Sequence, residues 1–170
     1  MIVLGIDPGI HGAIAMYDGD KLFVTDLPTI SMEAKAAKTK SGKKKIFTRI
    51  NQPELADLFN YTFCGATHAY YEDVTAMPGN GGVSMFNFGY AAGLPTMCAV
   101  MCGIPVTPVS PTKWKAEMGL NNDGERSRTR ALQLFPNHVE FFKLKKDHNK
   151  AEAALLAYFG FKMLTVGKVR

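Results

Sequence analysis

Residues 2–17 have the sequence IVLGIDPGIHGAIAMY, and this stretch decides the fold. The apolar, β-branched run at 2–6 stops at an Asp-Pro-Gly turn, a pattern that predicts a short buried strand. Two further strands, at 13–17 and 21–26, flank an Asp-Gly-Asp turn and predict a hairpin. The chain is therefore expected to begin with three antiparallel strands.

The rest of the chain alternates between predicted helices and strands. A helix starts at Asn51, and the apolar patterns that follow predict a strand at 66–72, a helix at 84–102, a strand at 104–109, short helices at 111–118 and 126–134, and a last helix at 149–164. This order predicts an α/β fold. Its mixed five-stranded sheet has three antiparallel strands, then parallel strands, and is flanked by helices.

The composition is that of one globular domain. The chain has 170 residues, of which 46% are hydrophobic, so a disordered tail and two full-sized domains are both excluded. The three cysteines lack the spacing of a metal site, and Cys98 and Cys102, beside Met97 and Met101, predict the core face of a helix. We expect a single domain over 1–170. It is expected to be intracellular, in the cytoplasm or an organelle lumen, and neither secreted nor membrane-embedded, because no signal peptide or membrane-length apolar stretch is seen.

The positive charge of the chain is concentrated in one segment. The formal net charge is +5, and residues 31–49 alone contribute +6, from seven basic residues and one acid. A concentrated basic run is typical of proteins that bind a polyanion such as nucleic acid. We expect residues 31–46 to be a basic, flexible loop. Its Lys43, Lys44 and Lys45 either reach a DNA duplex or only keep the loop soluble.

Acidic side chains occur where three predicted elements begin or end. Asp7 closes the first strand, Glu72 closes the strand at 66–72, and Asp147, His148 and Glu152 lie at the start of the last helix. Functional groups gather beyond the carboxyl ends of strands in open α/β sheets. Carboxylates that meet there repel one another unless cations neutralise them, and oxygen ligands suit Mg²⁺ or Mn²⁺. The pattern predicts a divalent metal site.

Each of these residues also has a structural interpretation. Asp7 can start a turn, and Glu72 can be a solvated strand end. Asp147 can cap the last helix, His148 can be a surface histidine, and Glu152 can face the helix dipole. The four-residue spacing from His148 to Glu152 puts both on one helix face, whereas Asp147 reaches that face only from the cap. Asp147 and His148 remain alternatives for the companion of Glu152.

Four stretches of the chain resemble the RuvC-type Holliday junction resolvases of the ribonuclease H-like superfamily. They are GIDPGIHGAIA at 5–15, YYEDVTAMPGNGGVSMFNFGYAAG at 70–93, PVSPTKWK at 108–115 and KKDHNKAEAALLAYFG at 145–160. The last stretch is most similar to the phage and organellar branch, which has a Lys-Lys-Asp-His-x-x-Ala-acid-Ala motif. The four motifs occur in the family's order, and the resemblance covers most of the chain apart from residues 29–50.

The resemblance implies a ribonuclease H-like fold and an acidic site that holds two Mg²⁺ or Mn²⁺ ions. Asp7, Glu72 and Glu152 match the family's carboxylates. Bacterial members place a further acid three residues before the last one, where this chain has Asn149. The implied activity is endonucleolytic resolution of four-way DNA junctions. A homodimer would make paired symmetric nicks with 5′-phosphate and 3′-hydroxyl ends, and its dimer face would be the helix after residue 84.

The resemblance also implies DNA contacts. The loop after Glu72 approaches the junction centre in the family, and cations on the following helices bind phosphates. Met77, Gly79, Gly81 and Gly82 belong to this loop, and Lys115 and Arg128 lie where the family carries its phosphate-binding bases. Lys113 and Arg126 are further candidates, because they are cations at helix spacing from these two. The alternative interpretations are a plain glycine-rich turn and solvated helix surfaces, and for Phe86 and Phe88 we expect a place in the core.

Three other functions remain as alternatives. The same fold can support a broader endonuclease for branched or flap DNA, and a metal-free module can recognise junctions without cutting them. Asp-Pro-Gly followed by Gly12 is also similar to the phosphate loop of sugar kinases and actin-like phosphotransferases. Those proteins need two such domains around the nucleotide, and 170 residues hold only one.

Overall fold

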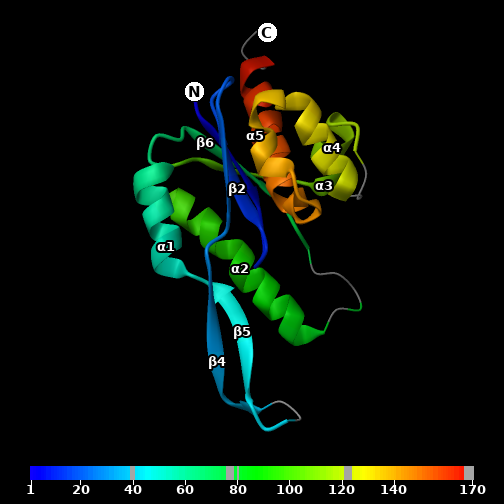
Figure 1. Ribbon diagram of the computed structural model, residues 1–170. Coiled ribbons are helices and arrows are strands. Elements are labelled where there is room, and N and C mark those ends of the chain that lie inside the picture. Colours follow the sequence, from blue (N-terminus) through cyan, green and yellow to red (C-terminus); the bar gives the residue numbers. More distant parts are fainter. Residues whose placement is uncertain (39–40, 76–78, 80, 121–123, 167–170) are drawn as a thin grey trace.

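A five-stranded mixed sheet lies at the centre of the computed structural model, which describes residues 1–38, 41–75, 79, 81–120 and 124–166 (Figure 1). The strand order is β3-β2-β1-β6-β7. The strands are β1 (Val3–Asp7), β2 (Ala13–Tyr17), β3 (Leu22–Asp26), β6 (His68–Glu72) and β7 (Val106–Val109). The first three are antiparallel, and β6 and β7 run parallel to β1. The predicted fold class is confirmed.

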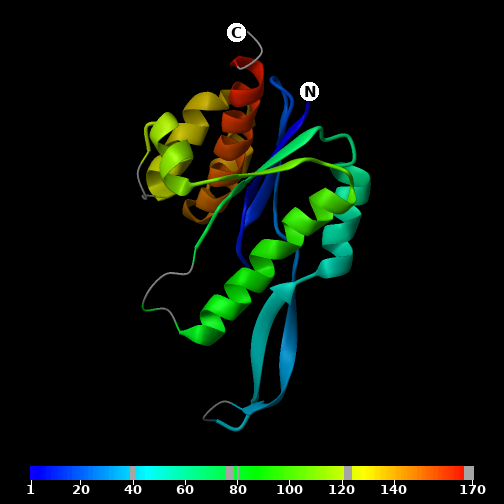
Figure 2. The same ribbon diagram turned by 180° about the vertical axis from the view of Figure 1, so that it is seen from behind.

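Helices cover both faces of this sheet (Figures 1 and 2). The α-helices are α1 (Gln52–Asp57), α2 (Gly82–Met101), α3 (Pro111–Glu117), α4 (Gly124–Leu134) and α5 (His148–Val166). Shorter helical segments are the π-helix η1 (Leu58–Thr62) and the 3₁₀ helices η2 (Pro136–Phe142) and η3 (Lys145–Asp147). Alternate residues of β1 serve the two faces, since Val3 packs with α5 and Leu4 and Ile6 pack with α1 and α2.

Helix α5 lies directly on β1 because Gly5 has no side chain. A Cβ atom at Gly5 would lie 2.1 Å from the carbonyl oxygen of Ala153 and 2.3 Å from the backbone nitrogen of Ala157. Small residues on α5 complete the contact, and Ala153 and Ala157 are both fully buried. This close approach brings the first turns of α5 to the end of β1, where Asp7 lies.

Within 31–46, residues 31–38 and 44–46 lie in two paired strands of a β-hairpin, so the prediction of a loop there was wrong. Strands β4 (Thr29–Lys38) and β5 (Lys44–Ile50) pair in an antiparallel two-stranded sheet that is separate from the central one. The hairpin projects from the rest of the fold (Figures 1 and 2). The segment is polar and rich in lysine, so its strand pattern is weak. Ile30 and Met32 are two residues apart on β4 and lie opposite Arg49 and Phe47 on β5, as alternate residues of paired strands do.

The exposed face of α2 corrects two further expectations. Phe86 is 69% exposed rather than part of the core, whereas Phe88 is half-buried. The predicted core face around the cysteines is also wrong for Met97, Met101 and Cys102, which are exposed. The helix buries a narrower stripe that includes Ala91, Pro95 and Ala99. Within the described residues, no helix is both long and apolar enough to cross a membrane.

Candidate functional site

Three carboxylates from distant parts of the sequence meet at one edge of the sheet. Asp7, Glu72 and Glu152 each offer an oxygen, and these oxygens all lie within 4.8 Å of one another. Asp7 and Glu72 are each 8% exposed, and Glu152 is half-buried. Three of the four acids that the sequence placed at element ends therefore form one cluster, and Asp147 is not part of it.

The position of each carboxylate follows from the fold. Because β1 and β6 are parallel neighbours, with Ile6 opposite Tyr71, their last residues, Asp7 and Glu72, lie side by side at the same edge. Beyond Asp7 the chain turns sharply, and a Cβ atom at Gly12 would lie 2.1 Å from the Asp7 carbonyl oxygen. Glu152 precedes Ala153, which contacts β1 at Gly5, so it lies next to Asp7.

Dedicated hydrogen bonds orient two of the three carboxylates. The indole nitrogen of buried Trp114, on α3, donates to Oε1 of Glu72 at 3.1 Å. The hydroxyl of fully buried Ser127, on α4, donates to Oε1 of Glu152 at 2.9 Å. These donors limit the rotation of the two carboxylates.

Lys115 lies between two of the carboxylates, although the sequence suggested a phosphate contact for it. Its ammonium nitrogen is 3.3 Å from Oε2 of Glu152 and 3.7 Å from Oε1 of Glu72. The side chain is only 12% exposed and its ammonium also lies 5.1 Å from the ring centre of Trp114. Lys115 reaches this place because Ser110 caps α3 directly after β7, accepting a hydrogen bond from the Lys113 backbone nitrogen at 3.3 Å.

The electrostatics of the cluster favour a further cation. Burial raises the pKa of Asp7 well above its ordinary value, and the nearby carboxylates of Glu152 and Glu72 raise it further against the opposing effect of Lys115. Burial also raises the pKa of Glu72, while Lys115 and the Trp114 hydrogen bond oppose the rise. One ammonium cannot balance three buried carboxylates, so their full ionisation requires added positive charge.

The donor set fits a hard divalent metal ion. All three donors are carboxylate oxygens, which Mg²⁺ and Mn²⁺ prefer, and the residues that supply them are held by strands and a helix rather than by loops. Trp114 and Ser127 supply the outer hydrogen bonds that ligating carboxylates commonly receive. The site can therefore hold a divalent cation.

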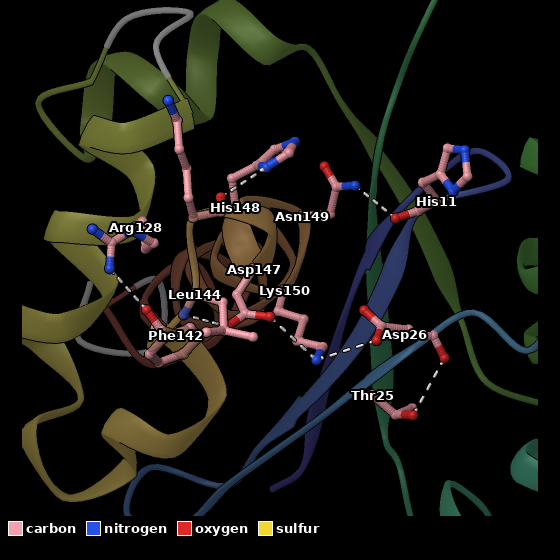
Figure 3. Close-up of polar contacts among 11 residues, drawn as sticks. His11, Thr25, Asp26, Arg128, Phe142, Leu144, Asp147, His148, Asn149 and Lys150 are labelled. Carbon is pink, nitrogen blue, oxygen red and sulfur yellow. Dashed lines mark hydrogen bonds and ion pairs between the residues drawn. The ribbon is translucent and has the colours of Figure 1, made fainter.

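The structure uses Asp147 differently from the three clustered acids (Figure 3). Asp147 is 5% exposed, and its Oδ2 accepts a hydrogen bond from the backbone nitrogen of Leu144 at 2.7 Å. Its Oδ1 lies 3.5 Å from the ammonium nitrogen of Lys150, which is 3.2 Å from Oδ2 of Asp26 on β3. These contacts tie the start of α5 to the turn before it and to the central sheet.

His148 and Asn149 also lie outside the carboxylate cluster. The Nδ1 atom of His148 is 3.4 Å from the carbonyl oxygen of Lys145, and His148 lines the groove beside the cluster. The amide of Asn149 donates to the carbonyl oxygen of His11 at 2.6 Å, and so joins α5 to the loop after β1 (Figure 3).

A wide groove opens onto the carboxylates, with a volume of about 1570 Å³. Its lining holds the acids Glu72, Asp73, Glu125 and Glu152. It also holds basic side chains from four elements, namely Lys115, Arg128, Lys145, Lys146 and His148. Arg128 is held in place by the carbonyl oxygen of Phe142 at 3.0 Å and by an ion pair with Glu125. Acids surrounded by bases suit a ligand that is itself a polyanion.

The other predicted DNA contacts have different positions. Lys113 and Arg126 are exposed on α3 and α4, and the three lysines at 43–45 are exposed in the hairpin, away from the cluster. Gly79, with a φ of +90°, and Gly81 and Gly82 lie at or before the start of α2. Met77 lies outside the described residues.

Sequence reasoning missed Trp114 and Ser127 as site residues, and it missed Lys145 and Lys146 as groove residues. Trp114 carried a usable signal, because a buried indole nitrogen needs an acceptor and a strand-end carboxylate is nearby in the fold. Ser127 carried none, since a serine within a helix of charged residues is ordinary.

Two solved structures resemble the whole chain. T. thermophilus RuvC in complex with a Holliday junction substrate matches with a TM-score of 0.57 and 14% identity, over 96% of this chain and 96% of that chain. A structure of Thermus thermophilus RuvC matches with a TM-score of 0.55 and 15% identity, over 97% and 98%. No protein-family model and no curated protein matches the sequence. At these identities the likeness shows the fold, and the chain has the mixed-sheet, ribonuclease H-like fold of RuvC.

Proposed function

We propose that this protein is a metal-dependent endonuclease that resolves four-way DNA junctions by paired symmetric nicks. The observation that carries the proposal is the cluster of Asp7, Glu72 and Glu152 at a groove whose lining includes Lys115, Arg128, Lys145 and Lys146. A similar fold is found in a RuvC structure that contains a Holliday junction substrate. The motif at 145–160 supports a place near the phage and organellar branch of these resolvases.

The proposed reaction is hydrolysis of a phosphodiester. A water oxygen bonds to phosphorus, the bond between phosphorus and O3′ breaks, and the proton released by the water balances the proton gained by O3′. The products are a 5′-phosphate and a 3′-hydroxyl. Asp7, Glu72 and Glu152 would hold Mg²⁺ or Mn²⁺, two ions by analogy with RuvC-type enzymes. Bound metal would supply an activated water and charge stabilisation at the scissile phosphate.

The remaining residues of the groove have supporting roles in this proposal. Trp114 and Ser127 hold the carboxylates in position, and Lys115 offsets part of their charge. Arg128, with Lys145 and Lys146, would bind the phosphates on either side of the cut. We assign Asp147 to the start of α5 and His148 to the groove wall, because neither belongs to the carboxylate cluster.

We further propose that α2 forms the interface of a homodimer. Exposed apolar side chains recur along one side of the helix at spacings of three, four and seven residues. This α2 seam consists of Val83, Phe86, Tyr90, Met97, Val100 and Met101. Gly93 is exposed midway, and a Cβ atom there would meet nothing within 4 Å, so a second helix can approach closely. A twofold dimer places two sites on the two opposed strands of a junction.

A cleavage assay on synthetic DNA tests the proposal. Wild-type protein, Glu72→Gln and Glu152→Gln are incubated with labelled four-way, three-way, flap and linear substrates in Mg²⁺, Mn²⁺ or Ca²⁺. We expect wild type to nick the four-way junction at symmetric positions. Each variant should lose on the order of 10³-fold in rate, since it removes one carboxylate that holds the metal.

The other outcomes of this assay decide between the alternatives. Equal cutting of flaps and junctions would replace the proposal by a broader branched-DNA endonuclease. Tight junction binding without nicking in either metal would leave a recognition module that does not cut. A Glu152→Gln variant as active as wild type would remove Glu152 from the site, and the same assay on Asp147→Asn and His148→Ala would then identify its replacement.

A further inference from the structure

The β4–β5 hairpin is the most basic part of the molecule. Residues 33–45 contain six lysines and one acid, Glu33, which gives the segment a formal charge of +5. Lys43, Lys44 and Lys45 are exposed at the start of β5 and beside the turn. Lys44 forms an ion pair with Glu33 at 2.9 Å, and both of these side chains are more than half exposed. The charges of Lys43, Lys44 and Lys45 are therefore open to an external anion.

The root of the hairpin is fixed to α2 by Arg49. The guanidinium of Arg49 donates to the side-chain oxygen of Asn87 at 2.7 Å. It also lies 5.2 Å from the ring centre of Phe47 and 5.3 Å from that of Tyr90. Gln52, just after β5, hydrogen-bonds the Tyr90 hydroxyl. These contacts hold the hairpin at a defined angle to α2.

The same helix contacts the catalytic edge on its other side. Phe88 lies against Gly9 in the loop after Asp7, at 3.2 Å from the position of a Gly9 Cβ atom. A cavity of about 400 Å³ between α2 and the end of β6 is lined by Met85 and Phe88 from the helix and by Glu72. One rigid helix thus connects the hairpin root to the edge that carries the carboxylates.

We propose that the β4–β5 hairpin is a duplex-binding arm, whose exposed lysines contact the backbone phosphates of one junction arm away from the cut. This inference deepens the proposed function and rests on it for the DNA substrate. The hairpin projects beyond α2 in both views (Figures 1 and 2). At about 3.4 Å per residue, Lys44 lies roughly 17 Å along β5 from the Arg49 attachment.

The chemistry of the exposed hairpin favours DNA over a protein partner. Duplex DNA carries one negative charge per about 1.7 Å of its axis, so three neighbouring exposed lysines can contact more than one backbone phosphate. The side chains of Thr48 and Ser31, which face each other across the hairpin, are exposed hydroxyl donors to the same groups. Lysine side chains are depleted at the centres of protein interfaces. The exposed apolar residues Ile30 and Met32 lie nearer the root, and among the described residues of the outer part Ile46 is an exposed apolar side chain beside the lysines.

A pair of matched variants tests the arm. Lys43→Ala/Lys45→Ala removes two charges and leaves the Lys44–Glu33 pair in place, and Lys43→Arg/Lys45→Arg keeps the charge. Binding to a labelled four-way junction is measured over a range of salt concentrations with Ca²⁺ in place of Mg²⁺. The slope of log K against log salt is negative, and each lost phosphate contact makes it shallower by about 0.9. The slope of the alanine variant should therefore be shallower than that of wild type by about 1.8.

The affinity and the footprint give two further readouts. At about 0.1 M salt the alanine variant should bind at least about tenfold more weakly, and the arginine variant within about twofold of wild type. Hydroxyl-radical footprinting should show protection near the crossover and a second protected patch on an arm, and the alanine variant should lose only the second. Thermal unfolding checks that all three proteins are folded, because exposed lysines contribute little to stability.

Three other outcomes would contradict the proposal that the hairpin binds DNA, and they can be told apart. If wild type binds and cuts junctions and the alanine variant does so with the same affinity and salt slope, the hairpin is not a DNA contact and the proposed function stands. If the alanine variant instead dissociates a dimer in sedimentation, the hairpin serves a second copy of this chain. If wild type binds no junction, the proposed function fails together with the arm.

Discussion

The carboxylate cluster and the β4–β5 hairpin are built in opposite ways. The three carboxylates come from β1, β6 and α5, and side chains from α3 and α4 contact them. The cluster is largely buried and depends on contacts between residues far apart in the sequence. The hairpin is made by local pairing of two neighbouring strands, keeps Lys43, Lys44 and Lys45 exposed, and contacts α2 through Arg49. Substitutions in the cluster should therefore alter chemistry and stability together, whereas substitutions in the hairpin should alter binding alone.

The largest expected effect outside the carboxylates comes from their hydrogen-bond donors. Trp114→Phe keeps the ring and removes the donor to Glu72, and Ser127→Ala removes the donor to Glu152. Losing such an outer partner typically costs about 10- to 100-fold in metal affinity or activity. We expect the Mg²⁺ concentration for half-maximal nicking to rise by about this factor in both variants.

Thr129→Ala is the matched control for Ser127→Ala. It removes a hydroxyl from the same helix, but that hydroxyl is exposed and donates to the carbonyl oxygen of Glu125 one turn back. Its Mg²⁺ requirement should equal that of wild type. If Ser127→Ala and Thr129→Ala behave alike, the hydrogen bond to Glu152 does not support the site.

The clustered acids could be predicted from the sequence because strand ends are local signals. Asp7 and Glu72 follow short apolar runs, and parallel neighbours bring such ends to one edge. The inward position of Lys115 could not be predicted, since the spacing of lysines on a short helix does not say which one faces the sheet. Ser127 depends on how α4 packs on α5, which no local pattern contains.

The two strands of the hairpin could not be predicted from the sequence. The five strands of the central sheet are apolar enough to be recognised, whereas the polar residues of β4 and β5 resemble a loop in composition. Only alternation across two paired strands identifies such a hairpin, and pairing is not visible in either strand alone. The same reasoning left Asp147 open, because a cap and a metal ligand have the same sequence pattern at a helix start.

Asp147→Ala separates those two roles. It leaves the backbone nitrogen of Leu144 without its acceptor and Lys150 without one of its two acidic partners. We expect a loss of about 1–3 kcal/mol in the free energy of unfolding, since a hydrogen bond and an ion pair to the buried Asp147 side chain are lost. The Mg²⁺ concentration for half-maximal nicking should stay within about twofold of wild type, because Asp147 is outside the cluster.

Asp26→Ala is the control for Asp147→Ala, because it removes the other acidic partner of Lys150. Asp26 is 66% exposed, so its loss should destabilise the protein by less than the loss of Asp147. An Asp147→Ala variant that unfolds like wild type but no longer nicks in Mg²⁺ would make Asp147 a metal ligand after all.

The pH dependence of stability gives a smaller effect with a definite sign. The pKa values of Asp7 and Glu72 are raised in the folded protein, so the folded state binds protons that the unfolded state has released. In the absence of metal, stability must then fall as pH rises from the ordinary carboxyl pKa, 3.8 for Asp7, towards the raised values. Thermal unfolding in EDTA from about pH 4 to pH 8 measures this fall.

Asp7→Asn sharpens the pH measurement. The variant removes the most strongly perturbed carboxyl, so its Tm in EDTA should decline less with pH and exceed that of wild type at pH 8. A gain of about 1 kcal/mol corresponds to about 2–4 °C for a chain of this length. Added Mg²⁺ should raise the Tm of wild type and leave that of Asp7→Asn nearly unchanged. If the Tm of Asp7→Asn in EDTA at pH 8 is below that of wild type, the ionised Asp7 side chain does not destabilise the folded protein.

The smallest expected effect on stability lies in the hairpin. Lys44 and Glu33 are 59% and 62% exposed, and such surface pairs contribute about 0.2–1 kcal/mol or less. Lys44→Ala and Glu33→Ala should therefore each move Tm by no more than about 2 °C. Their effects on junction binding should differ, because Lys44→Ala removes a cation and lowers the salt slope by about 0.9, whereas Glu33→Ala leaves every lysine in place. Two variants with equal Tm and unequal salt slopes would establish that the hairpin acts through its charge. Equal salt slopes would contradict a DNA contact at Lys44.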